Sequence, residues 1–292
     1  MKGDRFPVLE IFGPTIQGEG MVIGRKTMFI RTAGCDYSCS WCDSAFTWDG
    51  SGKEDIRWMA PEKILEELDR LGAGTFDHVT LSGGNPALLG GLGKLIDSLH
   101  ARGWSVALET QGSRWQDWFA AIDDLTLSPK PPSSGMETDW RVLDAIVGKL
   151  REVPLSEERH RKDGPAGEEH SFRKPAARQG GTAGENTVAA GSRGRLPDGR
   201  NARGTSVSLK VVVMDDADLA YARTVHLRYP GVPFFLQPGN PDVAEEDQGR
   251  LLHGLLGRYE WLVGCVMEDR SMRNVRVLPQ LHTWLWGNRR GV

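Results

Sequence analysis

Cysteine is scarce in this chain, with four among 292 residues. Long apolar runs are missing as well: no stretch reaches the roughly 18 residues that a membrane-spanning helix needs, and no signal peptide is recognisable. Nothing therefore indicates an oxidising compartment in which cysteines would pair. We expect a cytoplasmic protein with free thiols and no membrane partner.

An excess of positive charge is also missing. The formal net charge is −3 and the pI is about 6.2, so the composition predicts no basic surface for direct nucleic-acid binding. Hydrophobic residues make up 39% of the chain and charged residues 26%, which is ordinary for a soluble protein. The length suits one large α/β domain or two small domains.

Three of the four cysteines lie within residues 33–46. Cys35, Cys39 and Cys42 are spaced C-x3-C-x2-C, and the glycine, serine and aspartate residues around them favour a loop in which the thiolates converge. A structural zinc site needs four protein ligands, and the remaining cysteine, Cys265, is far away in the sequence. A [4Fe–4S] cluster held by three cysteines instead leaves one iron open to a small molecule.

We favour the cluster, but two other uses of these thiols remain open from the sequence. One is a zinc site completed by Cys265 or a distant histidine. The other is a disulfide between two of the three cysteines.

Elsewhere, apolar strands alternate with helices, which predicts a parallel sheet. Polar motifs follow the ends of these strands, and in parallel α/β proteins the carboxyl edge of the sheet carries the ligand site. The roughly six core strands are too few for a closed eight-stranded barrel, so we expect a partial, open TIM-like βα barrel of the α/β class. We expect strands at 8–12, 27–31, 78–82, 105–109, 124–128, 206–214, 233–237 and 275–278, and helices that include 60–72, 139–150 and 251–259.

Three further segments carry separate expectations. Residues 13–20 form a glycine-containing loop whose backbone groups suit a flat polar ligand. Residues 262–266 form an apolar, strand-like stretch in which Cys265 is a small hydrophobe. Residues 151–205 are rich in Gly, Arg, Glu, Ala and Ser and almost lack large apolar residues, so they cannot repay the entropy of ordering. We therefore expect a single domain over 1–292, interrupted by a disordered or loosely held insertion at about 151–205.

Together these motifs resemble those of the 7-carboxy-7-deazaguanine synthases, radical S-adenosylmethionine (SAM) enzymes of the 7-deazapurine (queuosine-precursor) pathway. The cysteine spacing, with the aromatic Trp41 before the third cysteine, is typical of the radical SAM superfamily. The stretches at 16–20 and 42–44 make the resemblance more specific, and the matching motifs cover nearly the whole chain outside the insertion. The other matching stretches are 29–31, 82–86, 109–112, 128–132 and 279–282.

The resemblance implies a lyase that converts 6-carboxy-5,6,7,8-tetrahydropterin into 7-carboxy-7-deazaguanine with loss of ammonia. SAM bound to the open iron is cleaved to a 5′-deoxyadenosyl radical, which takes a hydrogen atom from C6 of the pterin before the ring contracts; SAM is regenerated. The implied SAM-binding residues are Trp41, Cys42, Asp43, Gly84, Ser128, Pro129 and Lys130. Relatives commonly have Glu after the glycine pair, whereas this chain has Asn85, which keeps an acceptor oxygen without the charge.

The implied substrate site combines a cationic clamp for the carboxylate of the pterin with backbone groups for its flat polar edge. Arg31, at the carboxyl end of a core strand, is the candidate clamp, and Ser82 would add a hydroxyl contact. Ile16, Gln17 and Gly18 would hydrogen-bond the pterin edge. The resemblance also implies Mg²⁺ at Ser44, where the family commonly has Thr, together with water and substrate oxygens.

The resemblance further implies a homodimer that receives electrons from a flavodoxin- or ferredoxin-type donor. Two other functions have to be weighed. An activase of a glycyl-radical enzyme shares the cysteine loop but installs a protein radical and consumes SAM; the stretches at 17–20 and 280–282 argue against it. A zinc-stabilised binding module would use the cysteine loop as a structural knuckle.

Overall fold

The computed structural model describes residues 5–152 and 204–292. Nine strands and six α-helices make up most of them, joined by loops and short 3₁₀ turns. The strands are β1 (Phe6–Ile16), β2 (Lys26–Thr32), β3 (Arg57–Met59), β4 (His78–Gly83), β5 (Ser105–Thr110), β6 (Asp124–Leu127), β7 (Ser206–Val213), β8 (Phe234–Pro238) and β9 (Val275–Val277). The helices are α1 (Pro61–Gly72), α2 (Gly93–Ala101), α3 (Trp140–Glu152), α4 (Asp216–Arg228), α5 (Gln248–Glu268) and α6 (Leu281–Trp286).

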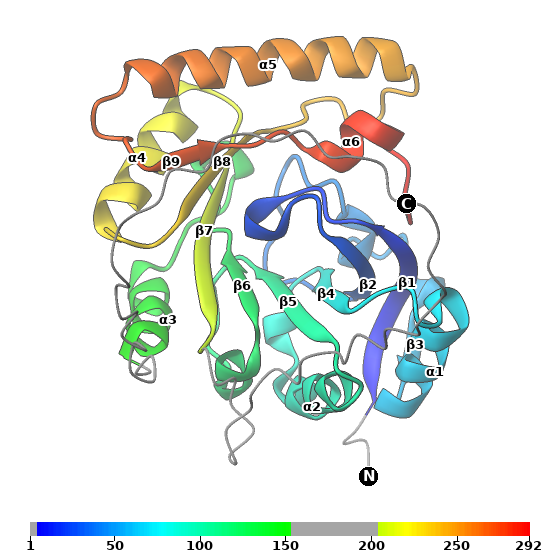
Figure 1. Ribbon diagram of the computed structural model, residues 1–292. Helices are drawn as coiled ribbons and strands as arrows, with labels where there is room; N and C mark the ends of the chain where they lie inside the picture. Colours follow the sequence, from blue (N-terminus) through cyan, green and yellow to red (C-terminus); the bar gives the residue numbers. More distant parts are fainter. Residues whose placement is uncertain (1–4, 153–203) are drawn as a thin grey trace, which may run out of the picture.

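All nine strands join one sheet in the order β3-β1-β2-β4-β5-β6-β7-β8-β9. From β2 to β9 each neighbouring pair is parallel. The sheet curves without closing, with helices α1, α2 and α3 on its outer side and α5 across one end (Figure 1). The expected open, partial βα barrel is confirmed.

The first strand differs from the expectation of a wholly parallel sheet. β1 pairs antiparallel with both β2 and β3. The short connection at 17–25 permits the direct reversal from β1 to β2, whereas a parallel pair needs a long crossover. β1 also continues to Ile16, so the first part of the expected loop at 13–20 is strand.

Sequence patterns explain the main elements. α1 begins with Pro61 at its first position and buries Ile64 and Leu68, as an amphipathic helix with a proline start should. β4 is buried along nearly its whole length, which is typical of a parallel strand covered on both faces. The core residues of the sheet and the outer helices form one continuous apolar cluster.

The structure near the end of the chain differs from the expectation in two ways. Cys265 lies in α5, not in a strand, and packs against the apolar core; periodicity cannot separate a short buried strand from a buried helix segment. α6 was not expected; it places His282 beside Gly18.

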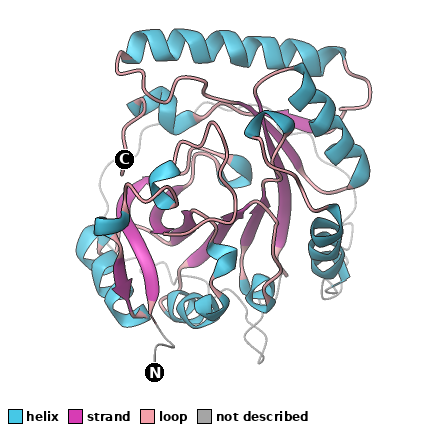
Figure 2. Ribbon diagram, turned by 180° about the vertical axis from the view of Figure 1, so that it is seen from behind, coloured by secondary structure: helices cyan, strands magenta, loops and turns pink. Residues whose placement is uncertain are grey.

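The expected insertion at about 151–205 lies almost entirely outside the described residues; α3 ends at Glu152 and β7 begins at Ser206. Within the described ranges, no helix combines the length and the apolar character that a membrane crossing needs. Figure 2 shows the loops that follow the parallel strands gathered inside the curve of the sheet, where the site described next is found.

Candidate active site

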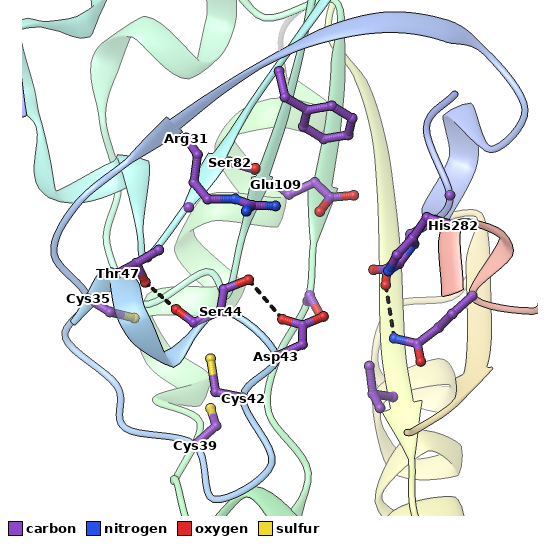
Figure 3. A pocket seen from close by; sticks show the side chains of 18 of the residues that line it. Arg31, Cys35, Cys39, Cys42, Asp43, Ser44, Thr47, Ser82, Glu109 and His282 are labelled. Carbon is purple, nitrogen blue, oxygen red and sulfur yellow. Dashed lines mark hydrogen bonds between the residues drawn. The ribbon is translucent and has the colours of Figure 1, made fainter. Parts of the chain in front are cut away.

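A cavity of about 220 Å³ opens where the carboxyl ends of the parallel strands meet. Its walls come from β1, β2, β4, β5, β7, the cysteine loop and the segment after β9. Figure 3 shows three thiols on one side, Arg31 above them and His282 opposite. The predicted site residues that line it are Ile16, Gln17, Gly18, Arg31, Cys35, Cys39, Trp41, Cys42, Asp43, Ser44, Ser82, Gly84, Ser128 and Lys130. Pro129 is buried and lies outside the lining.

The three cysteines of the loop face this cavity as free thiols, so the disulfide alternative is wrong. Burial raises the pKa of all three, that of Cys39 to about 11. Nearby negative charge acts in the same direction: that of Cys42 on both Cys35 and Cys39, and that of Asp43 on Cys42. Buried thiols that resist ionisation lose their protons when a positively charged, thiophilic group binds them, because that group stabilises the thiolates. Three such thiols at one cavity therefore favour a site for such a group. Since Cys265 lies elsewhere in the fold, the donor set fits a cluster with three thiolates.

Hydrogen bonds from other segments hold the cysteine loop in place. Gly34 N–H donates to Thr47 O, and Asn85 N–H donates to Gly34 O. The indole N–H of Trp41 donates to Ser133 Oγ at 2.9 Å, and that hydroxyl donates to Asp218. The loop that carries the ligands is therefore anchored to its own later part at Thr47 and to the loops after β4 and β6.

Asn85 does not offer its acceptor oxygen to the cavity. Its Oδ1 accepts from Ala87 N–H and from Thr110 Oγ1 at 2.8 Å, and its Nδ2 donates to Asp36 and Ser113. The side chain is 1% exposed. Asn85 therefore braces the cysteine loop from behind.

Arg31 lies at the end of β2, directly beside Ser82 in the β2–β4 pairing. One of its nitrogens, Nη1, donates to Glu10 Oε2 at 2.9 Å. The guanidinium lies against the rings of Phe12 and Phe46, and burial lowers its pKa. The rest of the planar fork faces the cavity, as a clamp for an anion requires.

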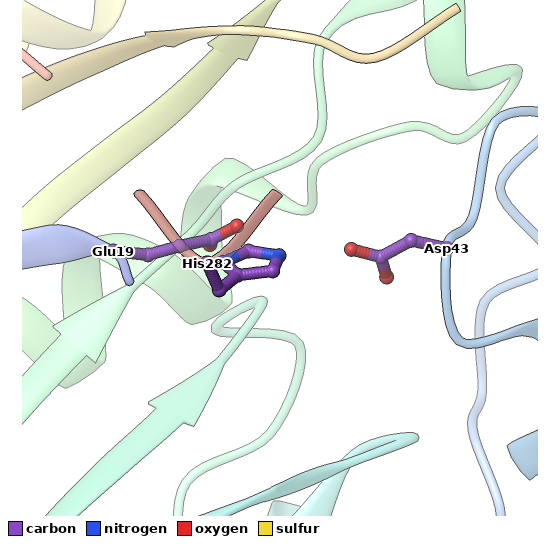
Figure 4. A group of neighbouring side chains, drawn as sticks. All are labelled: Glu19, Asp43 and His282. Atoms are coloured by element: carbon purple, nitrogen blue, oxygen red, sulfur yellow. The ribbon is translucent and has the colours of Figure 1, made fainter. Parts of the chain in front are cut away.

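Ser44 donates from Oγ to Asp43 Oδ1 at 2.9 Å. Asp43 faces Glu19 and His282 across the pocket, and one ligand atom of each lies within 4.8 Å of the other two (Figure 4). Two carboxylates and one imidazole are ligands that divalent cations accept, so these three side chains are a candidate cation site. Glu19 is already paired with Lys210, which opposes binding of a second cation there.

A buried ion group on the floor of the cavity was not expected from the sequence. Lys210, in the middle of β7, is 5% exposed and pairs with Glu19 and, at 3.8 Å, with Glu109. Although burial alone would raise the pKa of Glu19, the charge of Lys210 lowers it to about 2. Burial and the charge of Glu19 raise the pKa of Glu109. A lysine within an otherwise uncharged strand was the sequence signal for this group.

The segment after β9 also contributes side chains that sequence reasoning did not assign. Gln280 donates from Nε2 to Glu19 Oε1 at 3.0 Å, and His282 and Arg289 line the cavity. Gln280 and His282 belong to a stretch that had only a family match, with no role. Their position depends on the packing of α6 against the loop that contains Gly18.

Comparison with known proteins agrees with this geometry. Residues 29–132 match the Radical SAM superfamily. The chain is 53% identical over 286 residues to the 7-carboxy-7-deazaguanine synthase of Bacillus subtilis, covering 98% of each chain. It is 49% identical over 288 residues to that of Bacillus cereus, covering 99% of each. The crystal structure of QueE from Escherichia coli aligns over 95% of both chains with a TM-score of 0.55 at 20% identity, which supports the fold.

Membership of the superfamily implies two cofactors, a [4Fe–4S] cluster and SAM. The cluster supplies a low-potential electron that cleaves SAM. The thiols of the cysteine loop satisfy the ligand requirement. Neither residue type that a zinc site would need joins them among the described residues, because Cys265 lies in α5 and the His282 imidazole groups with Glu19 and Asp43. The chain is a radical SAM enzyme and belongs to the 7-carboxy-7-deazaguanine synthase family.

Proposed function

We propose that this chain converts 6-carboxy-5,6,7,8-tetrahydropterin into 7-carboxy-7-deazaguanine and ammonia. The observation that carries the proposal is the convergence of two sites on one cavity: three free thiols on one side and the Arg31 guanidinium on another. Radical transfer requires the cofactor and the substrate to meet without intervening water. A site with both an anion clamp and a cluster loop meets that requirement.

The proposed SAM site lies beside the thiols. Trp41, Cys42 and Asp43 would contact the adenosine side, and Gly84 lets the backbone approach the amino acid part. Ser128, Pro129 and Lys130 would close the site from the loop after β6. Lys130 supports this assignment because its cation is near Cys39 and Cys42 and suits the carboxylate of SAM.

The proposed substrate site lies between Arg31 and the Glu19–Glu109 floor. Arg31 would bind the carboxylate, and the neighbouring Ser82 would add a hydroxyl contact. Backbone groups of Ile16, Gln17 and Gly18 would bind the edge of the pterin. The Gln17 N–H already donates to Arg25 O and the Gln17 carbonyl already accepts from Gly24 N–H, so a contact through Gln17 would use the second lone pair of that carbonyl.

Mg²⁺ would bind at Ser44 together with water and substrate oxygens. The position of Ser44 at the cavity wall, beside Asp43 and below Arg31, supports this proposal. A homodimer and a flavodoxin- or ferredoxin-type electron donor are further proposals, based on the family resemblance. A cytoplasmic location is proposed because the site depends on reduced thiols.

Anaerobic incubation of the reconstituted protein with SAM, dithionite, Mg²⁺ and carboxy-tetrahydropterin tests the proposal. We expect 7-carboxy-7-deazaguanine and ammonia in equal amounts, with many turnovers per SAM. Stoichiometric loss of SAM without this product would indicate an activase. A colourless protein that contains zinc and no iron would indicate a binding module instead.

A further inference from the structure

Two side chains outside the cysteine motif direct N–H groups at the cluster-binding sulfurs. Trp48 and Gln111 are these donors, and neither carries an assigned role. We propose that they set the reduction potential of the cluster, and so determine which reductants can drive SAM cleavage. The inference rests on the cluster assignment of the proposed function.

Trp48 contacts Cys42. It follows the 3₁₀ turn Ala45–Thr47, where its backbone N–H donates to Ala45 O at 2.9 Å. This turn fixes the backbone of Trp48 six residues after Cys42, and the indole Nε1 donates to Cys42 Sγ at 3.5 Å. Trp48 itself lines the cavity. The indole has a single polar group, and it is directed to a sulfur.

Gln111 contacts Cys35. It follows β5, is 6% exposed, and its Nε2 lies 3.6 Å from Cys35 Sγ. The same nitrogen donates to Asp36 Oδ1 at 2.6 Å, which holds the carboxamide in this orientation. The backbone N–H of Tyr37 is a second donor to Cys35 Sγ, at 3.4 Å. Both sulfurs therefore accept hydrogen bonds that the fold holds in advance.

Hydrogen-bond donors to the cysteine sulfurs shift the one-electron reduction equilibrium of the cluster. Reduction adds negative charge that is shared with the cysteine sulfurs, so hydrogen bonds to those sulfurs stabilise the reduced form more than the oxidised form. Loss of a donor should therefore lower the potential. The neighbouring carboxylates of Asp36 and Asp43 act in the opposite direction.

The test is an anaerobic redox titration of the reconstituted full-length protein without SAM, with dithionite as reductant and the paramagnetic signal of the reduced cluster as readout. Omitting SAM separates an effect on the cluster from an effect on SAM binding. Trp48→Phe keeps an apolar ring and removes the donor; Gln111→Leu removes the carboxamide. In each variant we expect about tenfold less reduced cluster at a fixed potential, which for a one-electron couple is about 59 mV. Trp58→Phe, at an exposed site on β3, is the matched control and should not shift the potential.

Iron per chain is measured before each titration. If both variants contain as much iron as the parent protein and have the same reduction potential, the inference is wrong while the proposed function stands. If both lose their iron, the two side chains serve assembly and the inference is also wrong. A parent protein without iron would instead overturn the proposed function itself.

Discussion

Arg31 and Glu10 face each other across the β1–β2 pairing, with Arg31 Nη1 donating to Glu10 Oε2 at 2.9 Å. Arg290 reaches the other oxygen of the same carboxylate. Glu10 therefore holds Arg31 by one nitrogen and leaves the remainder of the guanidinium directed at the cavity. The clamp is pre-oriented by a residue that does not line the site.

Replacement of Arg31 should separate substrate binding from radical chemistry. Loss of a buried guanidinium–carboxylate pair costs about 2–5 kcal/mol, so Arg31→Ala should raise the substrate KM by roughly 30-fold to several-thousand-fold. Arg31→Lys should recover part of this because lysine supplies the charge without the fork. The measurement is KM beside 5′-deoxyadenosine formed without substrate, which should persist.

Arg25→Ala is the control for Arg31, since Arg25 lies just before the other end of β2 and pairs with Asp124. It should leave KM unchanged. A parallel loss of substrate turnover and of substrate-free SAM cleavage in Arg31→Ala would place Arg31 in the cofactor site and contradict the clamp.

The cysteines should divide into three ligands and one bystander. Cys35→Ala, Cys39→Ala and Cys42→Ala should each abolish cluster assembly and turnover, because two thiolates do not hold the cluster. Cys265→Ala should retain both, since Cys265 lies in α5. Iron per chain decides the matter, and an iron-free Cys265→Ala protein would refute the assignment.

Ser44 should control the response to Mg²⁺. Ser44→Ala removes the hydroxyl that we assign to the ion, so stimulation of turnover by Mg²⁺ should weaken or vanish while the cluster persists. Ser44→Thr keeps the hydroxyl and is the matched control. Rates measured over a Mg²⁺ series test this; an unchanged response in Ser44→Ala would show that the ion binds elsewhere.

Lys210 should be essential to the fold at neutral pH. Lys210→Met leaves Glu19 and Glu109 buried without their cation, which should lower the free energy of unfolding by about 3–5 kcal/mol. The exposed Lys26→Met is the control and should change it little. Denaturant unfolding measures both, and equal stabilities would argue against the buried ion group.

The same group predicts an acid dependence in the parent protein. The pKa of Glu19 falls from its usual 4.5 to about 2 in the folded state, so its ionised form stabilises the fold above about pH 4.5. This contribution is lost as the pH falls toward about 2. In Lys210→Met this loss should disappear, because the cation that depresses the pKa is gone. Unfolding curves between pH 7 and pH 3 would show the difference.

Gly84 should be required for docking of the cysteine loop. A methyl group there would overlap the carbonyl of Gly34 and crowd Cys35 N, so Gly84→Ala should displace the loop and reduce iron incorporation. Gly148→Ala is the matched control: Gly148 lies inside α3 with open space around its Cβ position. It should stabilise the protein by roughly 0.5–1 kcal/mol. Normal iron content in Gly84→Ala would contradict the close approach.

Strong local patterns made much of this protein predictable from its sequence. The C-x3-C-x2-C spacing is a covalent constraint that brings thiolates together within one loop, whatever the rest of the chain does. Alternating apolar strands and helices impose a parallel sheet, and the sheet brings the motifs after its strands to one edge. The cysteine ligands, Arg31 and the glycine turn at Gly84 could therefore be placed together in advance.

Partners remote in the sequence could be found only in the tertiary structure. Lys210 meets Glu19 and Glu109 only because β7 and β5 flank the same cavity, and Glu10 orients Arg31 only because β1 runs antiparallel to β2. The sequence left the role of Asn85 open, and four hydrogen bonds to neighbouring residues direct its side chain away from the cavity. Side-chain chemistry determined which groups could act at the site, and packing between distant segments decided which of them face the cavity.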